Sequence, residues 1–340
     1  MKLGVAHALV DGMLVAGDVE VADGRVVAVG LAGSGSGIAA PGFVDVHIHG
    51  FAGVDFATAD AEGYRRAREA LVATGVTSFR PSFITAPEDE LVAALREVPA
   101  GLAAHLEGPF ISRAQRGMHP DAACRDPDVA LLERLLAAGP VGQVTLAPEL
   151  PGAIELVDLL VARGITVACG HTDATADEAH AAFDRGARHV THLFNAMRPF
   201  RHRDPGIAGA ALARDDVTVE LILDGNHVVD DAARVALRAA RGRIVLVTDA
   251  LAAAGAGDGE WRIGSVDVAV RDGVARCADG TLAGSVLTMP EAVRNFVALG
   301  ATIEEALVAA SRRSLAPGAV ADVVVLDDAL DVANVLLAGN

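Results

Sequence analysis

Short apolar stretches alternate with amphipathic ones along most of the chain, beginning at Pro41. Eight of them have the length of buried strands: residues 42–46, 76–80, 103–107, 144–148, 165–169, 189–193, 218–223 and 244–249. Segments rich in Ala, Leu and Arg, with helical periodicity, lie between them. Eight strand–helix steps over about 250 residues have the size and rhythm of a (β/α)8 TIM-like barrel. The alternative, an open doubly wound sheet, favours a glycine-rich phosphate-binding loop after its first strand, where this chain has His-Ile-His.

The two ends of the chain and one segment near residue 270 have a strand-and-turn pattern instead. Residues 1–40 read as short strands, with a hairpin turn at Asp23-Gly24 and a connector over residues 33–37. Residues 258–281 are predicted to form an inserted hairpin with turns at 272–273 and 279–280, and residues 322–337 are again strand-like. The sequence therefore predicts a barrel over residues 41–315, with the insertion at about 258–281, and a small β-sandwich domain that combines residues 1–40 with 316–340.

Composition and charge exclude several classes of protein. With 52% hydrophobic residues and a mean hydropathy of +0.38, the chain has the apolar side chains that a disordered protein lacks. A net charge of −17 argues against nucleic acid or an anionic membrane surface as a partner. The uncharged stretch 26–44 contains too many Gly, Ser and Pro residues for a membrane span. The N-terminal residues lack the pattern of a signal peptide, so we expect a cytoplasmic protein.

Histidines and carboxylates recur where the predicted strands end. The six residues are His47, His49, Glu107, His171, His192 and Asp249. In a barrel the carboxyl ends of the strands converge at one mouth, where the active sites of this fold lie. Imidazole and carboxylate groups are ligands for transition-metal ions, zinc above all, so we expect one or two ions there. His189, three residues before His192, is expected to face the helices instead.

A second set of residues indicates anion binding. Asn195 follows the sixth predicted strand, Arg203 lies in the loop after it, and His227 follows the seventh strand. An Arg and a His beside backbone amides could hold a phosphate group. The alternative is that Arg203 is a solvated charge in a loop.

Several segments, in their order along the chain, carry a resemblance to a known family. They include PGFVDVHIHG (41–50), HLEGPF (105–110), GMHP (117–120), GHTDAT (170–175), THLFNAM (191–197), LDGNHV (223–228), VTDAL (247–251) and LAGSVLTM (282–289). On these motifs, which lie between about residues 45 and 295, the chain resembles the N-acetylglucosamine-6-phosphate deacetylases of the metal-dependent amidohydrolase superfamily.

The resemblance implies a role for each matching position. Glu107, His171 and His192 would hold the main metal ion, His47 and His49 a second one, and Asp249 would be the acid/base. His119 would contact the substrate carbonyl as a further catalytic residue. Asn195, the amide of Ala196, Arg203 and His227 would bind the substrate, the last two reaching in from the neighbouring subunit of a homodimer with shared active sites.

The sequence departs from related enzymes at two points. Lys2 is the only lysine, so the chain cannot use the carboxylated lysine that bridges two metal ions in dihydroorotase-like or urease-like relatives. Glu107 is then the expected carboxylate ligand, and Glu149 is a weaker alternative as a bridging ligand. The segment 311–320 is shorter than is usual in the family, which leaves its packing between barrel and β-domain open.

The resemblance implies a hydrolase of a small-molecule substrate. The expected reaction is deacetylation of N-acetylglucosamine 6-phosphate to glucosamine 6-phosphate and acetate, in amino-sugar metabolism, by a metal-activated water with Asp249 as acid/base. Zinc is the first candidate metal, and Fe, Co or Mn are alternatives. The alternative substrates are N-acetylgalactosamine 6-phosphate and an N-acyl-amino acid. A non-catalytic protein that binds a metal or a sugar phosphate is the remaining alternative.

Overall fold

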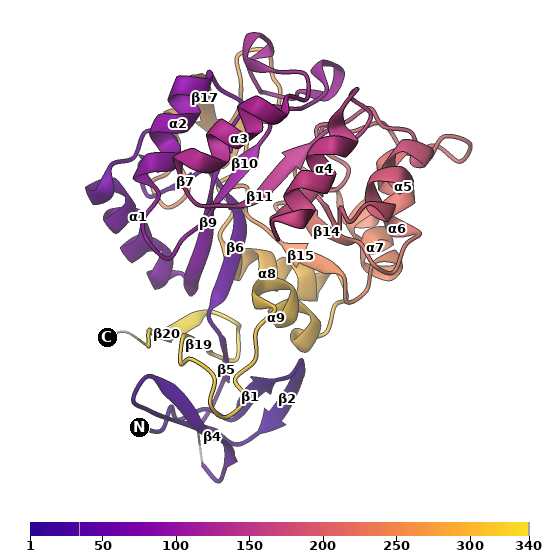
Figure 1. Cartoon of the computed structure of the whole chain (residues 1–340). Coiled ribbons are helices and arrows are strands. Elements are labelled where there is room, and N and C mark those ends of the chain that lie inside the picture. Colours follow the sequence, from indigo (N-terminus) through magenta and orange to yellow (C-terminus); the bar gives the residue numbers. More distant parts are fainter. Residues whose placement is uncertain (34, 339–340) are drawn as a thin grey trace.

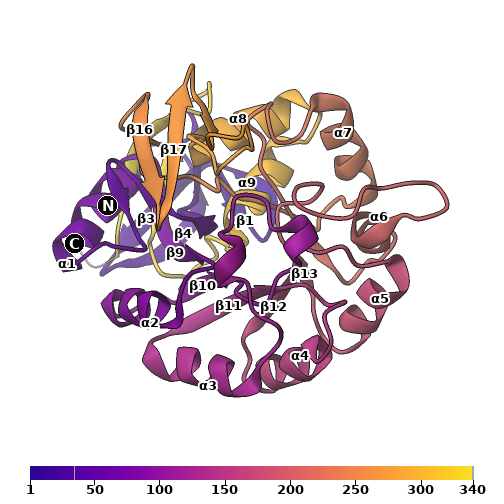
Figure 2. The same ribbon diagram turned by 90° about the horizontal axis from the view of Figure 1, so that it is seen from above.

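The centre of the molecule is a barrel of parallel strands, seen from the side in Figure 1 and from above in Figure 2. A computed structural model describes residues 1–33 and 35–338. The barrel strands are β6 (Phe43–Ile48), β9 (Val76–Ile84), β10 (Ala104–Glu107), β11 (Val141–Leu146), β12 (Thr166–Cys169), β13 (His189–Val190), β14 (Thr218–Leu221) and β15 (Ile244–Leu246). They pair in chain order. Ile48 bridges Ala250 in parallel, which joins the first strand to the last. The predicted (β/α)8 fold is confirmed.

Helices surround the barrel and bury apolar side chains against it (Figure 2). They are α1 (Ala61–Ala73), α2 (Glu88–Glu97), α3 (Val129–Ala138), α4 (Ala153–Ala162), α5 (Ala176–Asp184), α6 (Gly206–Leu212), α7 (Asp230–Ala239), α8 (Met289–Ala298) and α9 (Ile303–Ser311). In α7 the buried positions are Ala233, Ala236 and Leu237, which lie on one side of the helix. Two short 3-10 helices, Arg113–Gln115 and Asp121–Ala123, lie in the loop after β10.

Strands from both chain ends form one sheet below the barrel (Figure 1). Its order is β2 (Met13–Ala16), β1 (His7–Val10), β5 (Ile38–Pro41), β19 (Val323–Leu326) and β20 (Val332–Leu336). A separate hairpin joins β3 (Asp18–Ala22) to β4 (Arg25–Leu31). Val19, Val26, Ala39 and Val323 are among the buried residues of a second apolar core that these segments share. Ser34, within the predicted connector, and residues 339–340 lie outside the described residues.

The insertion near residue 270 has three strands, so the predicted hairpin was incomplete. β16 (Gly259–Ile263), β17 (Val266–Arg271) and β18 (Val274–Arg276) form an antiparallel sheet. The missed turn is at Gly264-Ser265, where Gly264 has a φ of +54°, a conformation that glycine favours. Gly264 N donates to Asp55 beside the barrel, at 2.7 Å.

The short segment 311–320 packs well between the barrel and the terminal sheet. Ser311 Oγ donates to the Gly42 carbonyl at 3.1 Å, and Leu315 N donates to the Leu9 carbonyl at 3.2 Å. Leu315 is fully buried in the second apolar core. The segment therefore contacts both the barrel and the terminal sheet. Across the described residues, no helix is both long enough and apolar enough to cross a membrane.

Candidate metal centre and active site

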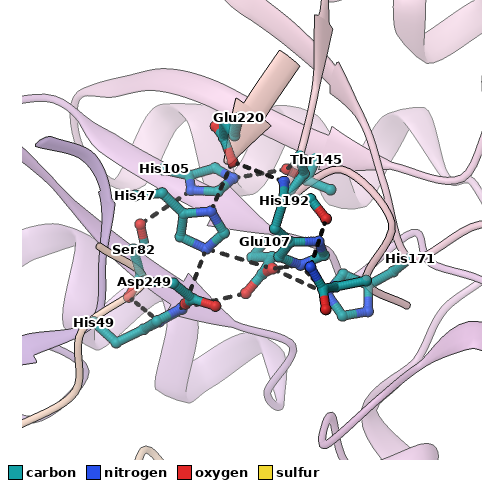
Figure 3. A network of polar contacts seen from close by, with 12 residues as sticks. His47, His49, Ser82, His105, Glu107, Thr145, His171, His192, Glu220 and Asp249 are labelled. Atoms are coloured by element: carbon teal, nitrogen blue, oxygen red, sulfur yellow. Dashed lines mark hydrogen bonds and ion pairs between the residues drawn. The ribbon is translucent and has the colours of Figure 1, made fainter. Parts of the chain in front are cut away.

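Six side chains converge at the carboxyl end of the barrel, and Figure 3 shows them from close by. His47 is in β6 and His49 follows it; Glu107 ends β10, and His171, His192 and Asp249 follow β12, β13 and β15. All six residues are at most 7% exposed. Their potential ligand atoms form two groups. We call Glu107, His171 and His192 the first metal group, and His47, His49 and Asp249 the second metal group. The structure thus brings together all the residues that were predicted to hold metal.

The first group is tight. Glu107 Oε1 lies 2.9 Å from His171 Nε2 and 3.0 Å from His192 Nε2. The two Nε2 atoms are only 3.1 Å apart. Two imidazole nitrogens and a carboxylate oxygen that point at one place form the kind of donor set that holds a divalent transition-metal ion.

The second group lies beside the first, and Glu107 faces both. Asp249 Oδ1 is 3.0 Å from His49 Nε2 and 3.5 Å from His47 Nε2. Glu107 Oε1 is 3.5 Å from His47 Nε2, and Glu107 Oε2 is 3.5 Å from His49 Nε2. The position of Glu107 between the groups suits a ligand shared by two ions.

Glu149 does not belong to this cluster, so the alternative of a bridging Glu149 is wrong. Its carboxylate accepts hydrogen bonds from the Thr172 hydroxyl at 2.5 Å and from Asp173 N at 2.6 Å. The side chain therefore holds the loop that follows His171.

An unpartnered nitrogen supports the fit of a metal ion. His47 Nε2 is buried and has no hydrogen-bond partner among the residues that the structure describes. Its other ring nitrogen, Nδ1, is 3.0 Å from Glu220 Oε2. Burying such an atom without a partner is costly, whereas a metal ion would use its lone pair. The imidazole and carboxylate set suits zinc and also accepts Fe, Co or Mn.

Three of these residues have a backbone conformation that residues other than glycine rarely adopt. The φ angles are +47° at His171, +25° at His192 and +51° at Asp249. Such strain is concentrated at functional sites, where the surrounding structure has to hold it. For Asp249, Ser285 N donates to its carbonyl oxygen at 2.8 Å, and its own N donates to His47 O at 2.9 Å.

Electrostatics keep Asp249 and Glu107 ionised. Burial raises the pKa of Asp249, but His47 and His49 more than offset this effect and bring it to about 2. Burial likewise opposes ionisation of Glu107, while His47 and His171 hold its pKa well below the usual range. Asp249 is therefore able to accept a proton at neutral pH.

His119 is neutral and its protonated nitrogen faces the site. Burial and the nearby His171 lower the pKa of His119 to about 4. Its Nδ1 accepts a hydrogen bond from Thr85 N at 3.2 Å, so the ring proton resides on Nε2. That Nε2 is 3.4 Å from Glu107 Oε2. His119 can thus donate a hydrogen bond to an oxygen atom at the metal groups.

A cavity of about 210 Å³ opens above the metal groups. The predicted residues in its wall are His49, Glu107, His119, His171, His192, Asn195, Ala196, His227 and Asp249. Ala196 has a φ of +47°, which belongs to a tight turn after β13. Metal groups and predicted substrate contacts therefore share one cavity.

His227 lies in the wall of the cavity in its own chain, and its contact with the substrate across a dimer interface stays a prediction. In the loop between β14 and α7, Asp224 Oδ2 lies 2.8 Å from His227 Nδ1 and fixes the orientation of the ring. Burial lowers the pKa of His227, but Asp224 outweighs it and the net shift is upward. Arg203 is exposed in the loop before α6, which projects away from the barrel in Figure 2, and it does not line the cavity.

His189 lies inside the barrel, so the expectation that it faces the helices was wrong. Its Nε2 is 2.8 Å from Glu220 Oε1, in the network that also includes His47. Strand β13 is only two residues long. The left-handed turn at His192 breaks the strict alternation on which the expectation depended.

Sequence reasoning missed Glu220, Asp45 and Ser285. The carboxylate of Asp45 accepts a hydrogen bond from the Thr248 hydroxyl, and Ser285 Oγ donates to the Thr248 carbonyl at 2.6 Å, so both hold the segment that carries Asp249. The available signal was a carboxylate inside an apolar strand, in GFVDV for Asp45 and in TVELIL for Glu220. Such a residue is almost never fully buried without a partner.

Comparisons with known proteins agree with this geometry. The model of the amidohydrolase family matches residues 38–340. N-acetylglucosamine-6-phosphate deacetylase of Mus musculus is 42% identical, in an alignment that covers 90% of this chain and 83% of the mouse protein. N-acetylgalactosamine-6-phosphate deacetylase of Escherichia coli O157:H7 is 35% identical, with 97% and 95% covered.

A solved structure matches nearly the whole chain. It is a mutant of N-acetyl-D-glucosamine-6-phosphate deacetylase from Mycobacterium smegmatis in complex with N-acetyl-D-glucosamine-6-phosphate. It has a TM-score of 0.95 and 40% identity, and the match covers 100% of this chain and 98% of that one. From the family model, the sequence identities and this structural match, we conclude that the chain belongs to the amidohydrolase family and groups with its amino-sugar-phosphate deacetylases.

Proposed function

We propose that this chain hydrolyses the N-acetyl amide of N-acetylglucosamine 6-phosphate to glucosamine 6-phosphate and acetate. The observation that carries the proposal is the pair of Asp249 and His119, an ionised carboxylate and a neutral imidazole, in one cavity with both metal groups. The relatives named above act on N-acetylglucosamine 6-phosphate or its galactosamine analogue, according to their names.

Asp249 and His119 have different tasks in the proposed reaction. A divalent ion bound by these groups would polarise the acetyl carbonyl and make water a better nucleophile. Asp249 accepts a proton from the attacking water as the new carbon–oxygen bond forms. His119 donates its Nε2 proton in a hydrogen bond to the carbonyl oxygen, where negative charge develops. Asp249 then gives its proton to the sugar nitrogen as the carbon–nitrogen bond breaks, which releases the amine and acetate.

We propose that each chain binds one or two divalent ions, and zinc is the first candidate. Glu107, His171 and His192 would form the main site, and His47 with His49 would complete a second site next to Asp249. The carboxylate of Glu107 is directed at both groups, which supports the second ion.

We also propose that the active enzyme is a homodimer in which Arg203 reaches the partner's site. A phosphate dianion needs cationic contacts, since the net charge of the chain is −17. His227 is the cavity residue with a raised pKa, and Asn195 and Ala196 add neutral contacts. Arg203 lies outside this cavity, so a phosphate contact by Arg203 calls for a second chain. The cytoplasmic location stays a prediction.

The test is a turnover assay on purified protein that has been stripped of metal and then reloaded with Zn, Mn, Co or Fe. We expect the protein to release acetate and the free amine from N-acetylglucosamine 6-phosphate. This activity should be lost when the metal is removed and restored by at least one of the ions. N-acetylgalactosamine 6-phosphate, unphosphorylated N-acetylglucosamine and an N-acetyl-amino acid are the comparison substrates. Faster turnover of the amino acid would favour that alternative. Binding of the sugar phosphate without turnover, with every ion tried, would contradict the enzyme proposal.

A further inference from the structure

Glu220 is a carboxylate in the barrel interior that the proposed reaction does not use. It lies in β14 and is 0% exposed. Its two carboxylate oxygens lie within hydrogen-bond distance of four nitrogen atoms. Oε2 is 3.0 Å from His47 Nδ1 and accepts from His192 N at 3.1 Å. Oε1 is 2.8 Å from His189 Nε2 and accepts from Gln143 Nε2 at 3.1 Å. Figure 3 shows Glu220 and Asp249 on opposite sides of the His47 ring.

A buried carboxylate needs a reason beyond stability. Removing a charge from water is costly, and well-packed apolar residues often replace buried charges without loss of stability. Its neighbours along β14, Val219 and Leu221, are apolar and fully buried, whereas the side chain of Glu220 faces four polar groups. The hydrogen bonds of Glu220 are therefore better explained by what they do to His47 and His192.

The contact with His47 fixes both its orientation and its tautomer. A carboxylate can only accept, so in the neutral ring that a metal ion requires, the proton is on Nδ1 and the lone pair is on Nε2. That Nε2 lies 3.5 Å from oxygens of Glu107 and Asp249. The same Glu220 oxygen holds the backbone of His192, where φ is +25°. One carboxylate oxygen thus links a member of the first metal group to a member of the second.

We propose that Glu220 is a positioning residue of the metal site, which holds His47 with Nε2 as the donor for an ion in the second group and sets its place relative to His192. Carboxylates behind metal-binding histidines do this in general, and removing one typically weakens metal binding about 10- to 100-fold. The inference rests on the metal site proposed above.

The experiment measures metal content and affinity, with a chelator as competitor, in four variants of the full chain. Glu220→Leu removes the carboxylate, and Glu220→Gln keeps its size and one acceptor oxygen. His47→Ala removes the ligand itself. Gln143→Leu is the matched control, because Gln143 is 1% exposed and contacts the other oxygen of Glu220 without contacting either metal group. Circular dichroism and thermal unfolding report on folding in each variant.

We expect Glu220→Leu to lose the same ion as His47→Ala, with affinity lowered about 10- to 100-fold, and to keep the ion of the first group. Glu220→Gln should restore part of that affinity, and Gln143→Leu should bind as the wild type does. If Glu220→Leu does not fold, the proposal is supported when Glu220→Gln binds the metal more weakly than the wild type and Gln143→Leu does not. Wild-type affinity in either folded Glu220 variant, or an equal loss in Gln143→Leu, would overturn it. A metal content that His47→Ala leaves unchanged would instead contradict the second ion site itself.

Discussion

Gly284 lies against the carbonyl oxygen of Asp249, so closely that a Cβ atom at position 284 would be 2.9 Å from that oxygen. Gly284 also has a φ of +64°, in the region that favours glycine. The next residue, Ser285, donates its N–H to the same oxygen at 2.8 Å. The segment LAGSVLTM therefore acts as a backbone support for the catalytic aspartate, although it contributes no side chain to the metal groups.

The first prediction concerns this support. Gly284→Ala should lower the free energy of unfolding by about 1–3 kcal/mol from backbone strain and should also lower kcat, because the added methyl group displaces Asp249. Gly164→Ala is the matched control: its φ is +69° and its Cβ would meet nothing within 4 Å. It should show the strain without the loss of kcat. Equal kcat values in the two variants, measured beside their unfolding curves, would mean that position 284 does not influence Asp249.

The second prediction concerns the proton transfer. Asp249→Asn should fold and bind substrate as the wild type does but lose about 10²–10⁴-fold in kcat, because an amide cannot accept the proton of water. Steady-state kinetics, with metal content measured on the same samples, provide the test. A variant that retains its metal and more than about a tenth of the wild-type kcat would require another base.

The third prediction concerns Arg203. A charge-assisted contact is worth about 1.5–3 kcal/mol, so Arg203→Ala should lower kcat/KM for the 6-phosphate roughly 10- to 150-fold. The same change should matter little for unphosphorylated N-acetylglucosamine. Arg201→Ala, an exposed arginine of the same loop, is the control.

Mixing Arg203→Ala with Asp249→Asn then tests the shared site. Each heterodimer would contain one site with both defects and one intact site, so part of the activity should return after subunit exchange. A mixture that exchanges subunits but regains no activity would place Arg203 outside its partner's site.

The fourth prediction concerns pH. Burial lowers the pKa of His227, but its hydrogen bond to Asp224 raises it above the usual value of 6.5. The imidazolium is present below that raised pKa and attracts the phosphate, so KM should rise as the pH increases through it. In Asp224→Asn the pKa falls, and the rise in KM should begin at a lower pH.

Near neutral pH, the Asp224→Asn variant should therefore have a KM roughly tenfold higher, which corresponds to about 1.4 kcal/mol. The phosphate of the substrate titrates equally with both enzymes, so comparing their profiles of KM against pH isolates His227. Superimposable profiles would show that the charge of His227 does not contribute to binding.

The pattern of the sequence predicted the barrel and the place of the metal groups for a topological reason. Strands that follow one another through helices pair in chain order, so residues after each strand meet at one end whatever their separation in sequence. His171 and His192 could therefore be predicted without any knowledge of side-chain packing.

What the sequence did not predict depends on local backbone geometry or on distant partners. His189 could not be assigned to the barrel interior, because the left-handed turn at His192 is invisible in the pattern. The role of Glu220 depends on His47, a partner 173 residues away. In both cases the missing information was a local backbone conformation or a contact between distant residues.

The seam at which the barrel closes has a consequence for assembly. The buried hydrogen bond from Thr248 to Asp45 crosses that seam between residues 203 positions apart, whereas Glu107 and His192 are separated by 85. The first metal group lies at the ends of β10, β12 and β13, whereas His47, His49 and Asp249 meet where the first and last strands of the barrel join. The second ion proposed above would be held by residues from both edges of the seam, so its binding would favour the closed barrel.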